Sequence, residues 1–512
     1  MRSRQRGARV GKCTGDLAGL SCKSPFMLGA DRCLGACTVF LLGMLGASCG
    51  LSTAAMVPST ESSGQIELPA LPWQLEEELP LAYSTRTVAL AHGTMMSGVG
   101  TIADSLIVMR DGRIAYAGPF DSERLQNELA PDGSLIDIRG LYVTPGLIDT
   151  HSHMGVYAMP QVRAHADGNE ATSPTTPGVY AGDSFWPQDP ALSRALAAGV
   201  TTVHILPGSA NLIGGRGVTI KLQPETSLES MRFVGAPYSL KMACGENPKR
   251  VYGQRHQPPS TRMGSVLWTR NAFQDALEYR QKFLDWQQKH RSGPEHVDPA
   301  PSPPTRDFGL ETLLQAIEGA ILVQVHCYRA DEMLRMLDLA DEFGFRVRAF
   351  HHAVEAYKIR EVLASRHVGV STWFDWWGFK AEAYDAIFET LPLLSEARVR
   401  AALHSDDAML VQRLNQEVAK AMTAGRIADI EVDREAAMRW ITADAAWILG
   451  IEHLVGTLEE GKMADVTVWN ADPFSVYASV TQVYVDGVLA YAASEGRRPS
   501  DFELGQPGTK IQ

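Results

Sequence analysis

Between Pro145 and Gly450 the sequence alternates short apolar segments with longer amphipathic ones. The apolar segments have the composition of buried strands: GLID, GVTTVHIL, MRFVGA, AILVQVHC, RVRAFHH, VGVSTWF and VRAALHS. The helical segments include ALSRALAA, NAFQDALEYRQKFLDWQQKH, ADEMLRMLDLADEF and LVQRLNQEVAKAMTAG. Strands that alternate with helices form parallel sheets joined by crossover helices, and their number fits an eight-stranded barrel. We therefore predict an α/β fold with a (β/α)8 TIM-like barrel over residues 144–454.

The segments on either side of this region have a different pattern. Residues 81–143 contain SLIVMRDGRIAYAG, in which apolar and polar residues alternate around Asp111-Gly112, a hairpin turn signal. Strand patterns return in GTLEEGKMADVTVWN and VTQVYVDGVLAY, within residues 455–500. We expect residues 81–143 and 455–500 to form one small β-sandwich from both ends of the chain. The sequence shows no internal repeat.

The first 49 residues have the pattern of an export signal. Basic residues precede the apolar run CLGACTVFLLGMLGAS, which ends in small residues. LGASCG resembles a bacterial lipoprotein processing box with Cys49 as the lipidated residue, although Gly46 stands where an aliphatic residue is usual. The competing interpretation is a membrane anchor, but the run is shorter than the ~20 apolar residues of a span. We expect an exported protein, periplasmic or on the outer surface, with a lipid anchor as an open alternative and residues 50–80 as a tether.

Composition limits the classes of partner. The 512 residues carry a formal charge of −12 with a sequence pI near 5.6, which argues against nucleic acid because phosphate binding needs a basic face. Five of the seven cysteines lie in the first fifty residues, which leaves Cys244 and Cys327 in the body of the chain. We therefore expect a small-molecule substrate and no disulfide framework.

Candidate metal ligands lie at the ends of the predicted strands. In a strand, residues i and i+2 point to the same side, so His151 and His153 in TPGLIDTHSHMG face one point. Two imidazoles that converge in this way suit a divalent metal such as zinc. Further candidates end later strands: His326, the pair His351-His352, and Asp406.

Each of these residues also has a structural explanation. His326 could be a hydrogen-bonded core histidine, and Asp406 or Asp407 could cap the following helix. All of these explanations would have to hold at once, at matching strand ends. The combined pattern favours a metal-dependent active site at the carboxyl end of the barrel.

The ordered motifs resemble the amidohydrolase superfamily. They are VTPGLIDTHSHMG, AAGVTTV, two histidines at strand ends, SDD and the late GTLEEGKMADVTVW followed by VYVDG. The resemblance covers about residues 85–490 and is closest to the imidazolonepropionase-like branch, including exported members with a GENPK element, here Gly245 to Lys249. The motifs are specific for the superfamily and weak for the substrate.

The resemblance also implies roles for individual residues. His352 is preferred over His351 because relatives show His, then two residues, then EAYK, and HAVEAYK starts at His352 here, so that His351 points away or supports the site from behind. The family uses a carboxylated lysine, for which Lys241 is the best match and Lys221 the alternative. The implied metal ligands, for one or two ions and zinc first, are His151, His153, Lys241, His326, His352 and Asp406.

The implied mechanism is hydrolysis of a C–N bond by a metal-activated water, with Asp406 as general base and then general acid. His404 and Ser405 are candidates to orient the ligating imidazoles. Trp373, Trp376 and Trp377 are candidates to line the pocket, and aromatic clusters are more often core. Candidates for holding a substrate carboxylate or carbonyl are Tyr238, Arg329, Asn211, Arg216, Tyr357 and Lys380, with the first two expected closest to the ligands.

Three functions compete at this stage. The first is a metal-dependent hydrolase of an amide, a cyclic amide or a dipeptide-like substrate. The second is a heterocycle deaminase of the same superfamily, which often has Glu three residues after the strand-five histidine, here His326, where this chain has Arg329. The third is a non-catalytic metal- or ligand-binding surface protein, which would not need Asp406. Association into homo-oligomers stays open, because relatives often associate.

Overall fold

The structure is a computed structural model that describes residues 71–74, 86–292 and 302–495. The expected export signal, with Cys49, and most of the expected tether lie outside these residues. Within the tether region, Trp73 is 1% exposed, packs on the rings of Tyr279 and Phe283, and donates a hydrogen bond to Glu318. This short segment is thus attached to the barrel helices. No helix among the described residues is long and apolar enough to cross a bilayer.

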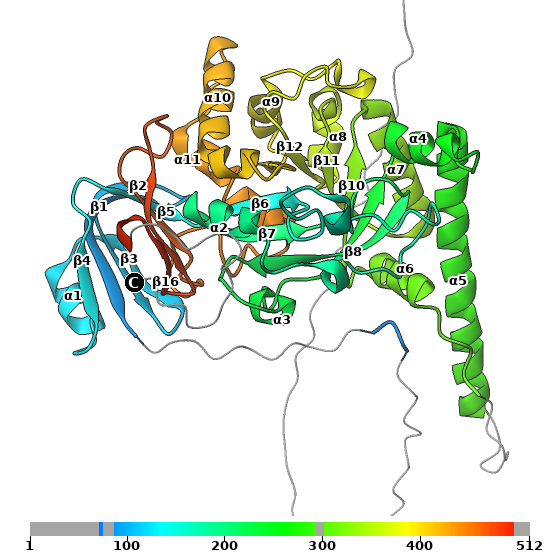
Figure 1. The fold of residues 1–512 in the computed structure, drawn as a ribbon, viewed down its shortest axis with the longest axis horizontal. Helices are drawn as coiled ribbons and strands as arrows, with labels where there is room; N and C mark the ends of the chain where they lie inside the picture. The colour runs from blue at the N-terminus through cyan, green and yellow to red at the C-terminus, as the bar shows by residue number, and fades with distance from the viewer. Residues whose placement is uncertain (1–70, 75–85, 293–301, 496–512) are drawn as a thin grey trace, which may run out of the picture. The chain divides into compact units, whose positions relative to one another are not determined.

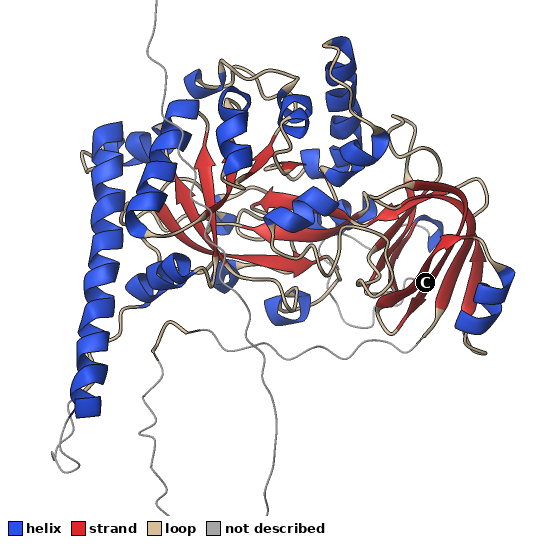
Figure 2. Cartoon of the chain, turned by 180° about the vertical axis from the view of Figure 1, so that it is seen from behind, coloured by secondary structure: helices blue, strands red, loops and turns tan. Residues whose placement is uncertain are grey.

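One eight-stranded sheet forms the barrel, with its strands in sequence order. Figures 1 and 2 show these strands with helices packed around them. The strands are β6 (Leu147–Ser152), β7 (Val200–Ile205), β8 (Ile213–Lys221), β9 (Ser239–Ala243), β10 (Leu322–Cys327), β11 (Val347–His352), β12 (Gly369–Thr372) and β13 (Ala401–Leu403). The predicted α/β barrel is confirmed.

The gap between β13 and β6 is bridged by backbone from the end of the barrel region. The N–H of Leu403 donates to the carbonyl of Trp440, and the N–H of Ile148 donates to that of Ile441. Near the carboxyl ends of these strands, the N–H of Asp406 donates to the carbonyl of His151 at 3.0 Å. The barrel is therefore nearly closed, and the last bond joins two predicted site residues.

Two details of the barrel differ from the sequence-based prediction. Strand β8 is antiparallel to both β7 and β9, because residues 206–212 are too few for the crossover that a parallel strand requires. The segment MRFVGA is not a strand; its Met231 ends the short helix α3 (Leu228–Met231), and the other residues follow that helix. Its apolar character comes from Phe233, which is 1% exposed and packs with Ile148 and Ala349 inside the barrel.

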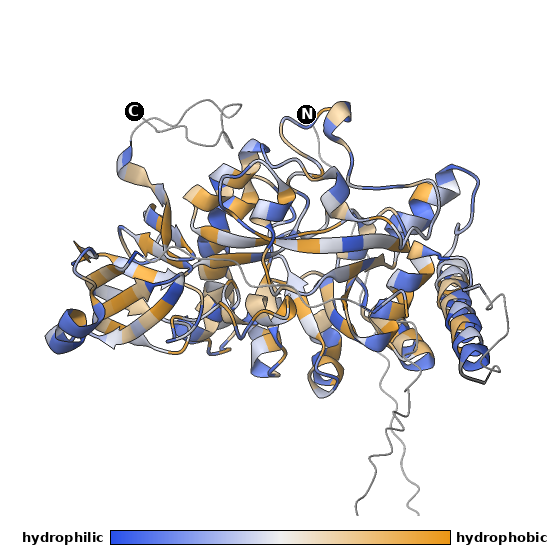
Figure 3. Cartoon of the chain, turned by 90° about the horizontal axis from the view of Figure 1, so that it is seen from below, coloured by the Kyte–Doolittle hydropathy of each residue, from blue (hydrophilic) through white to orange (hydrophobic). Residues whose placement is uncertain are grey.

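Helices cover the barrel through their apolar faces. Figure 3 shows the long α5 (Arg262–Ser292) of the barrel region as mostly hydrophilic, as it does the short α1 (Ser122–Glu128) outside the barrel, whereas the strands carry many hydrophobic residues. The helices of the barrel region are α2 (Pro190–Ala197), α3, α4 (Glu246–Gln254), α5 (Arg262–Ser292), α6 (Phe308–Glu318), α7 (Ala330–Phe343), α8 (Arg360–Ser365), α9 (Thr390–Glu396), α10 (Leu414–Ile427), α11 (Arg434–Arg439) and α12 (Ala443–Ile448). Short 3-10 helices lie at Arg163–His165, Ala181–Ser184, Ala356–Ile359, Ala381–Ala383, Leu410–Arg413 and Ala493–Glu495.

A second sheet combines strands from both ends of the described chain, as predicted. Its order is β16-β15-β14-β5-β1-β2-β3, with β4 paired to β1. The turn at Asp111 and Gly112, both with positive φ, joins β2 to β3 as the hairpin signal predicted. The strands are β1 (Val88–Met96), β2 (Thr101–Arg110), β3 (Arg113–Pro119), β4 (Ser134–Asp137), β5 (Tyr142–Pro145), β14 (Val466–Trp469), β15 (Val480–Val485) and β16 (Val488–Ala492), with α1 (Ser122–Glu128) packed beside β2.

Candidate metal centre

Side chains from three barrel strands and one loop meet at the carboxyl end of the barrel. His151 belongs to β6 and His153 follows that strand, while His326 lies on β10 and His352 ends β11. Their rings are close: the centroids of His151 and His352 are 4.7 Å apart, and those of His326 and His352 are 4.5 Å apart. The structure thus brings the four histidines of the predicted strand ends into one group.

Asp406 lies against this group of histidines. Its Oδ1 is 3.3 Å from Nε2 of His153 and 3.6 Å from Nε2 of His151, and its Oδ2 is 4.0 Å from Nδ1 of His352. Burial raises the pKa of Asp406 above its ordinary value, an effect that the nearby ammonium of Lys241 opposes. A carboxylate in this position can both face a cation and exchange a proton with a molecule beside it.

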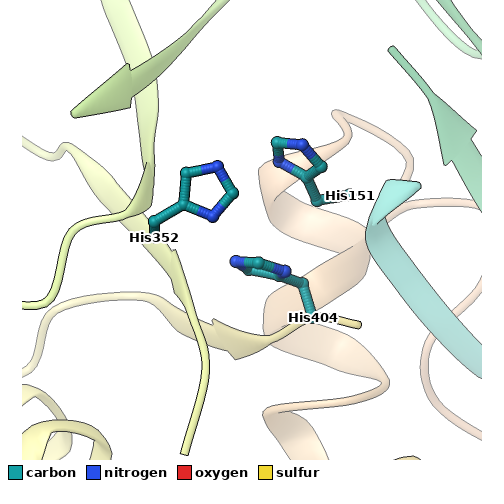
Figure 4. A group of neighbouring side chains, drawn as sticks. All are labelled: His151, His352 and His404. Atoms are coloured by element: carbon teal, nitrogen blue, oxygen red, sulfur yellow. The ribbon is translucent and has the colours of Figure 1, made fainter. Parts of the chain in front are cut away.

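His404 also faces the centre, which the sequence analysis did not predict. Its ring stacks on His151 with 5.1 Å between centroids and lies 5.0 Å from His352, and Figure 4 shows the three rings converging. One nitrogen of each of these three rings lies within 4.8 Å of the others. The available signal was its place directly after β13, but the sequence analysis considered His404 only as a residue that orients a ligand.

The backbone explains why two consecutive histidines both face inward. Neighbouring residues of a regular strand point to opposite sides. His351 faces the barrel interior, and β11 then ends at His352, where φ is +68° and the following Ala353 has φ of +41°. This left-handed turn brings the His352 ring back over the barrel mouth. His351 consequently supports the site from below, which is one of the two alternatives left open.

Lys241 reaches the same centre from β9. Its Nζ lies 3.4 Å from Nε2 of His151 and donates to the carbonyl of Pro207 at 3.2 Å. The side chain is 1% exposed, and burial lowers the pKa of its amine well below the usual value for lysine. Lys221 is the last residue of β8 and lies between Asp465 and Asp486. The structure therefore does not bring it to the histidines.

Asp149 holds the loop that carries Asp406. Its buried carboxylate accepts hydrogen bonds from the N–H and hydroxyl of Ser405 and from the N–H of His151 at 3.2 Å. Burial raises the pKa of Asp149 to about 6, and the bonds from Ser405 and His151 oppose this rise. One side chain thus links the metal-facing ends of β6 and β13.

The donor atoms fit a divalent metal. Within the described chain, Nδ1 of His326, Nδ1 of His352 and both ring nitrogens of His404 are buried and have no hydrogen-bond partner. A buried ring nitrogen without a partner is unfavourable unless something else binds it. Neutral imidazoles together with a carboxylate are the donors that zinc prefers, and burial lowers the pKa of each of these three histidines, which keeps the rings neutral.

Among the predicted substrate residues, the structure brings Lys380 to the edge of the centre. Its Nζ lies 3.7 Å from the centroid of the Tyr328 ring and donates to Oδ1 of Asn247 at 3.3 Å. Nδ2 of Asn247 is in turn 3.5 Å from Nε2 of His326. Lys380 therefore places a positive charge within reach of a ligand that occupies the barrel mouth.

The other predicted substrate residues lie elsewhere. Tyr238 precedes β9, and its carbonyl accepts from Leu322 at the end of the barrel opposite His326. Arg216 lies against the rings of Tyr180 and Tyr238. Tyr238 lies there because it precedes β9, which is parallel to β10, and Arg216, on the antiparallel β8, pairs with Leu240 of β9.

Three predicted residues are occupied by other contacts. The side chain of Asn211 donates to the carbonyl of Glu170 and the hydroxyl of Thr176, and accepts from Tyr252. Arg329 pairs with Asp331 at 2.9 Å at the start of α7. Tyr357 likewise donates to the carbonyl of Asp385.

Aromatic rings and a cavity adjoin the centre. Trp373 is 4% exposed and stacks on His352 at 4.3 Å, and Trp376 stacks on Trp373 at 4.7 Å, whereas Trp377 is 58% exposed. A cavity of about 350 Å³ is lined by His153, Asp406, Tyr157, Arg163 and His165, among others. It gives a small molecule direct access to the carboxylate.

A disulfide joins the two strands beside His326, although the cysteine content implied no disulfide framework. Cys244 follows β9 and Cys327 ends β10, with 5.1 Å between their Cα atoms. The two residues are 83 positions apart in the chain and come together only because β9 and β10 are neighbours. The bond also fixes the start of GENPK, which begins α4 and carries Asn247.

The chain is similar in sequence to known amidohydrolases. Residues 360–491 match the profile of the amidohydrolase family. An amidohydrolase of Hapsidospora irregularis named tasK is 34% identical over 387 residues, which are 72% of this chain and 38% of that protein. The chain thus spans well under half the length of that relative. An imidazolonepropionase of Rhizobium rhizogenes is 24% identical over 74% of this chain and 89% of its own length.

A solved structure agrees with these sequence matches. The amidohydrolase from Thermotoga maritima MSB8 superposes with a TM-score of 0.70 and 34% sequence identity. The match covers 79% of this chain and 100% of that protein. The similarity therefore extends over most of this chain.

Proposed function

Since the chain belongs to the amidohydrolase superfamily, we propose that it hydrolyses a C–N bond in a small amide, cyclic amide or dipeptide-like substrate with a divalent metal, zinc being the first candidate. One observation carries the proposal. The carboxylate of Asp406 lies within 4.0 Å of three imidazoles from two strand ends, beside an open cavity. The histidines and Asp406 would hold the metal, with His404 as an additional donor.

A divalent cation at this point supplies polarisation of the scissile carbonyl and a lowered pKa of bound water. Asp406 accepts the proton of the attacking water and then delivers it to the leaving nitrogen. Asp149 and the bond from Asp406 N–H to His151 keep that carboxylate aimed at the reacting atoms. Trp373 and Tyr328 exclude water from one side, and Lys380 offers a positive charge to a substrate carboxylate or carbonyl.

The deaminase alternative has no support from a specific contact. The position that carries Glu in many deaminases of the superfamily is Arg329, which pairs with Asp331 at the start of α7. Its side chain cannot pass protons to a heterocycle at the centre. A purely metal-binding role does not require a carboxylate that lies beside the histidines and lines an open cavity, as Asp406 does.

The primary test of the function is an assay of metal-free and zinc-loaded protein on a panel of dipeptides, N-acyl amino acids and cyclic amides. We expect hydrolysis of at least one of these classes by the zinc-loaded protein, loss of that activity on chelation, and recovery on adding zinc. Release of ammonia from aminated heterocycles would favour a deaminase. Absence of hydrolysis and deamination over the whole panel, with zinc bound, would contradict an enzymatic role.

We also propose that Lys241 is carboxylated. Burial favours its neutral amine, which is the form that adds CO2 with loss of a proton to give a carbamate. The carbamate offers two oxygens to a metal, whereas an ammonium repels one. The distance of 3.4 Å from Nζ of Lys241 to Nε2 of His151 supports a carbamate that reaches the other candidate ligands.

In protein supplied with 13C-bicarbonate, a carbamate signal is expected for the wild type and not for Lys241→Met. The variant should also bind zinc at least about tenfold more weakly, the smaller of the losses seen when only a supporting group is removed. Lys221→Met is the matched control, because Lys221 ends β8 far from the histidines. This variant should retain the carbamate signal. Equal signals in the wild type and Lys241→Met would contradict carboxylation at this residue.

We further propose that the protein is exported, with a lipid on Cys49 as the finer form of that proposal. The pattern of residues 1–49 supports it, and so does the disulfide between Cys244 and Cys327, because disulfides persist in oxidising compartments. Cell fractionation and mass spectrometry of the mature N-terminus would test both.

A further inference from the structure

Two buried side chains beneath the centre, His351 on β11 and Gln324 on β10, have no part in the mechanism described above. Both are completely buried. They form a chain of hydrogen bonds that begins at a backbone carbonyl and ends on His151. Each bond in this chain has only one donor that fits, so the position of every proton can be followed.

The first bond orients the amide of Gln324. Its Nε2 donates to the carbonyl of Ile448 at 3.1 Å, and a carbonyl can only accept. The amide oxygen Oε1 is therefore the atom that faces Nε2 of His351 at 2.7 Å. Because Oε1 also only accepts, Nε2 of His351 carries a hydrogen.

The second bond passes this orientation to His151. A neutral imidazole has one N–H, so the Nδ1 of His351 presents a lone pair. None of the described contacts of His351 is with a carboxylate that would favour a second proton. Nδ1 of His351 lies 2.8 Å from Nδ1 of His151, which must then be the donor. Nε2 of His151 is left with its lone pair, on the side that faces Asp406.

We propose that Gln324 and His351 are positioning residues that set the tautomer of His151, so that its Nε2 presents a lone pair to a divalent cation. The inference rests on the proposed metal-dependent function. A histidine in the opposite tautomer would direct an N–H at the cation. Groups that orient a ligating imidazole in this way typically change metal affinity by about 10–100-fold.

The first part of the experiment needs no substitution. 15N NMR of the metal-free wild type, labelled on histidine, reports which ring nitrogen of His151 carries the proton, with His151→Gln identifying the signal. We expect the proton on Nδ1. A proton on Nε2 would overturn the inference, whether or not the protein binds zinc.

The second part compares two substitutions of His351 by competition for zinc with a chromophoric chelator. His351→Leu removes the acceptor for His151 and should weaken zinc binding by about 10–100-fold. His351→Asn keeps an oxygen near the place of Nδ1, so its affinity should stay close to that of the wild type. Equal weakening in both variants would indicate a packing role and overturn the inference.

Gln324→Leu provides the variant to use if His351→Leu does not fold. It removes the acceptor for His351 and leaves the His351 ring in place, so both tautomers of His151 become accessible and zinc affinity should fall. Unchanged affinity in this variant would count against the inference. Failure of the wild type to bind zinc would refute the proposed function alone, because the tautomer measured without metal would still stand.

Discussion

Replacing Asp406 by asparagine is expected to lower kcat by about 10³-fold, within the range by which a positioned general acid or base accelerates a reaction. The amide keeps the size of the side chain but cannot take a proton from water or deliver one to the leaving nitrogen. The zinc content should remain high, because the histidines around it are unchanged. Kinetics on whichever amide the panel identifies, together with metal analysis of the purified variant, would measure both effects.

Asp407→Asn is the matched control for this experiment. The carboxylate of Asp407 accepts from the N–H groups of Met409 and Leu410, both at 2.8 Å, and an asparagine oxygen can retain those bonds. Its kcat should be close to that of the wild type. If Asp406→Asn kept most of its activity with zinc bound, Asp406 would not be the general base.

Removing the disulfide by replacing Cys244 and Cys327 with alanine is expected to lower the free energy of unfolding by about 4–5 kcal/mol, from the entropy of closing so long a loop in the unfolded chain. The two cysteines are separated by 83 positions, so the crosslink restricts a large part of the unfolded ensemble. Urea unfolding of the wild type and the double variant, each measured under non-reducing conditions, would give the difference.

The reduced wild type is the internal control for the disulfide. With a reductant present, its urea midpoint should move towards that of the double variant, whereas the midpoint of the double variant should not change. If the reductant did not change the urea midpoint of the wild type, the two cysteines would not be joined in solution.

Several parts of the site could be predicted from local sequence. The spacing of His151 and His153, and the position of His326 after an apolar segment, follow from strand periodicity and from the rule that barrel chemistry lies at the carboxyl ends of strands. The alternation of strand and helix patterns predicted the barrel, and the strand patterns of both flanks predicted a shared second sheet. Each of these patterns lies within a short segment, so it can be recognised without the tertiary structure.

Other parts could not be obtained in this way. The role of His404 depends on how far β13 extends before the following loop turns towards β6. Asp406 is held beside the histidines by a hydrogen bond from its N–H to the carbonyl of His151. Lys221 lies away from the site because the short connection after β7 makes β8 antiparallel, and Tyr238 lies away because it precedes β9 at the end of the barrel opposite His326. The apolar segment MRFVGA has the composition of a strand, yet its burial comes from filling the barrel.

By itself, then, the sequence determined the alternation of elements, the strands whose ends carry imidazoles, and the membership in a superfamily with this chemistry. Only the tertiary structure decided that Cys244 meets Cys327, that His352 turns inward through a positive φ, and that Gln324 and His351 together orient His151. The physical reason is distance along the chain. Periodicity acts over a few residues, whereas each of these contacts joins segments that approach only when the barrel closes.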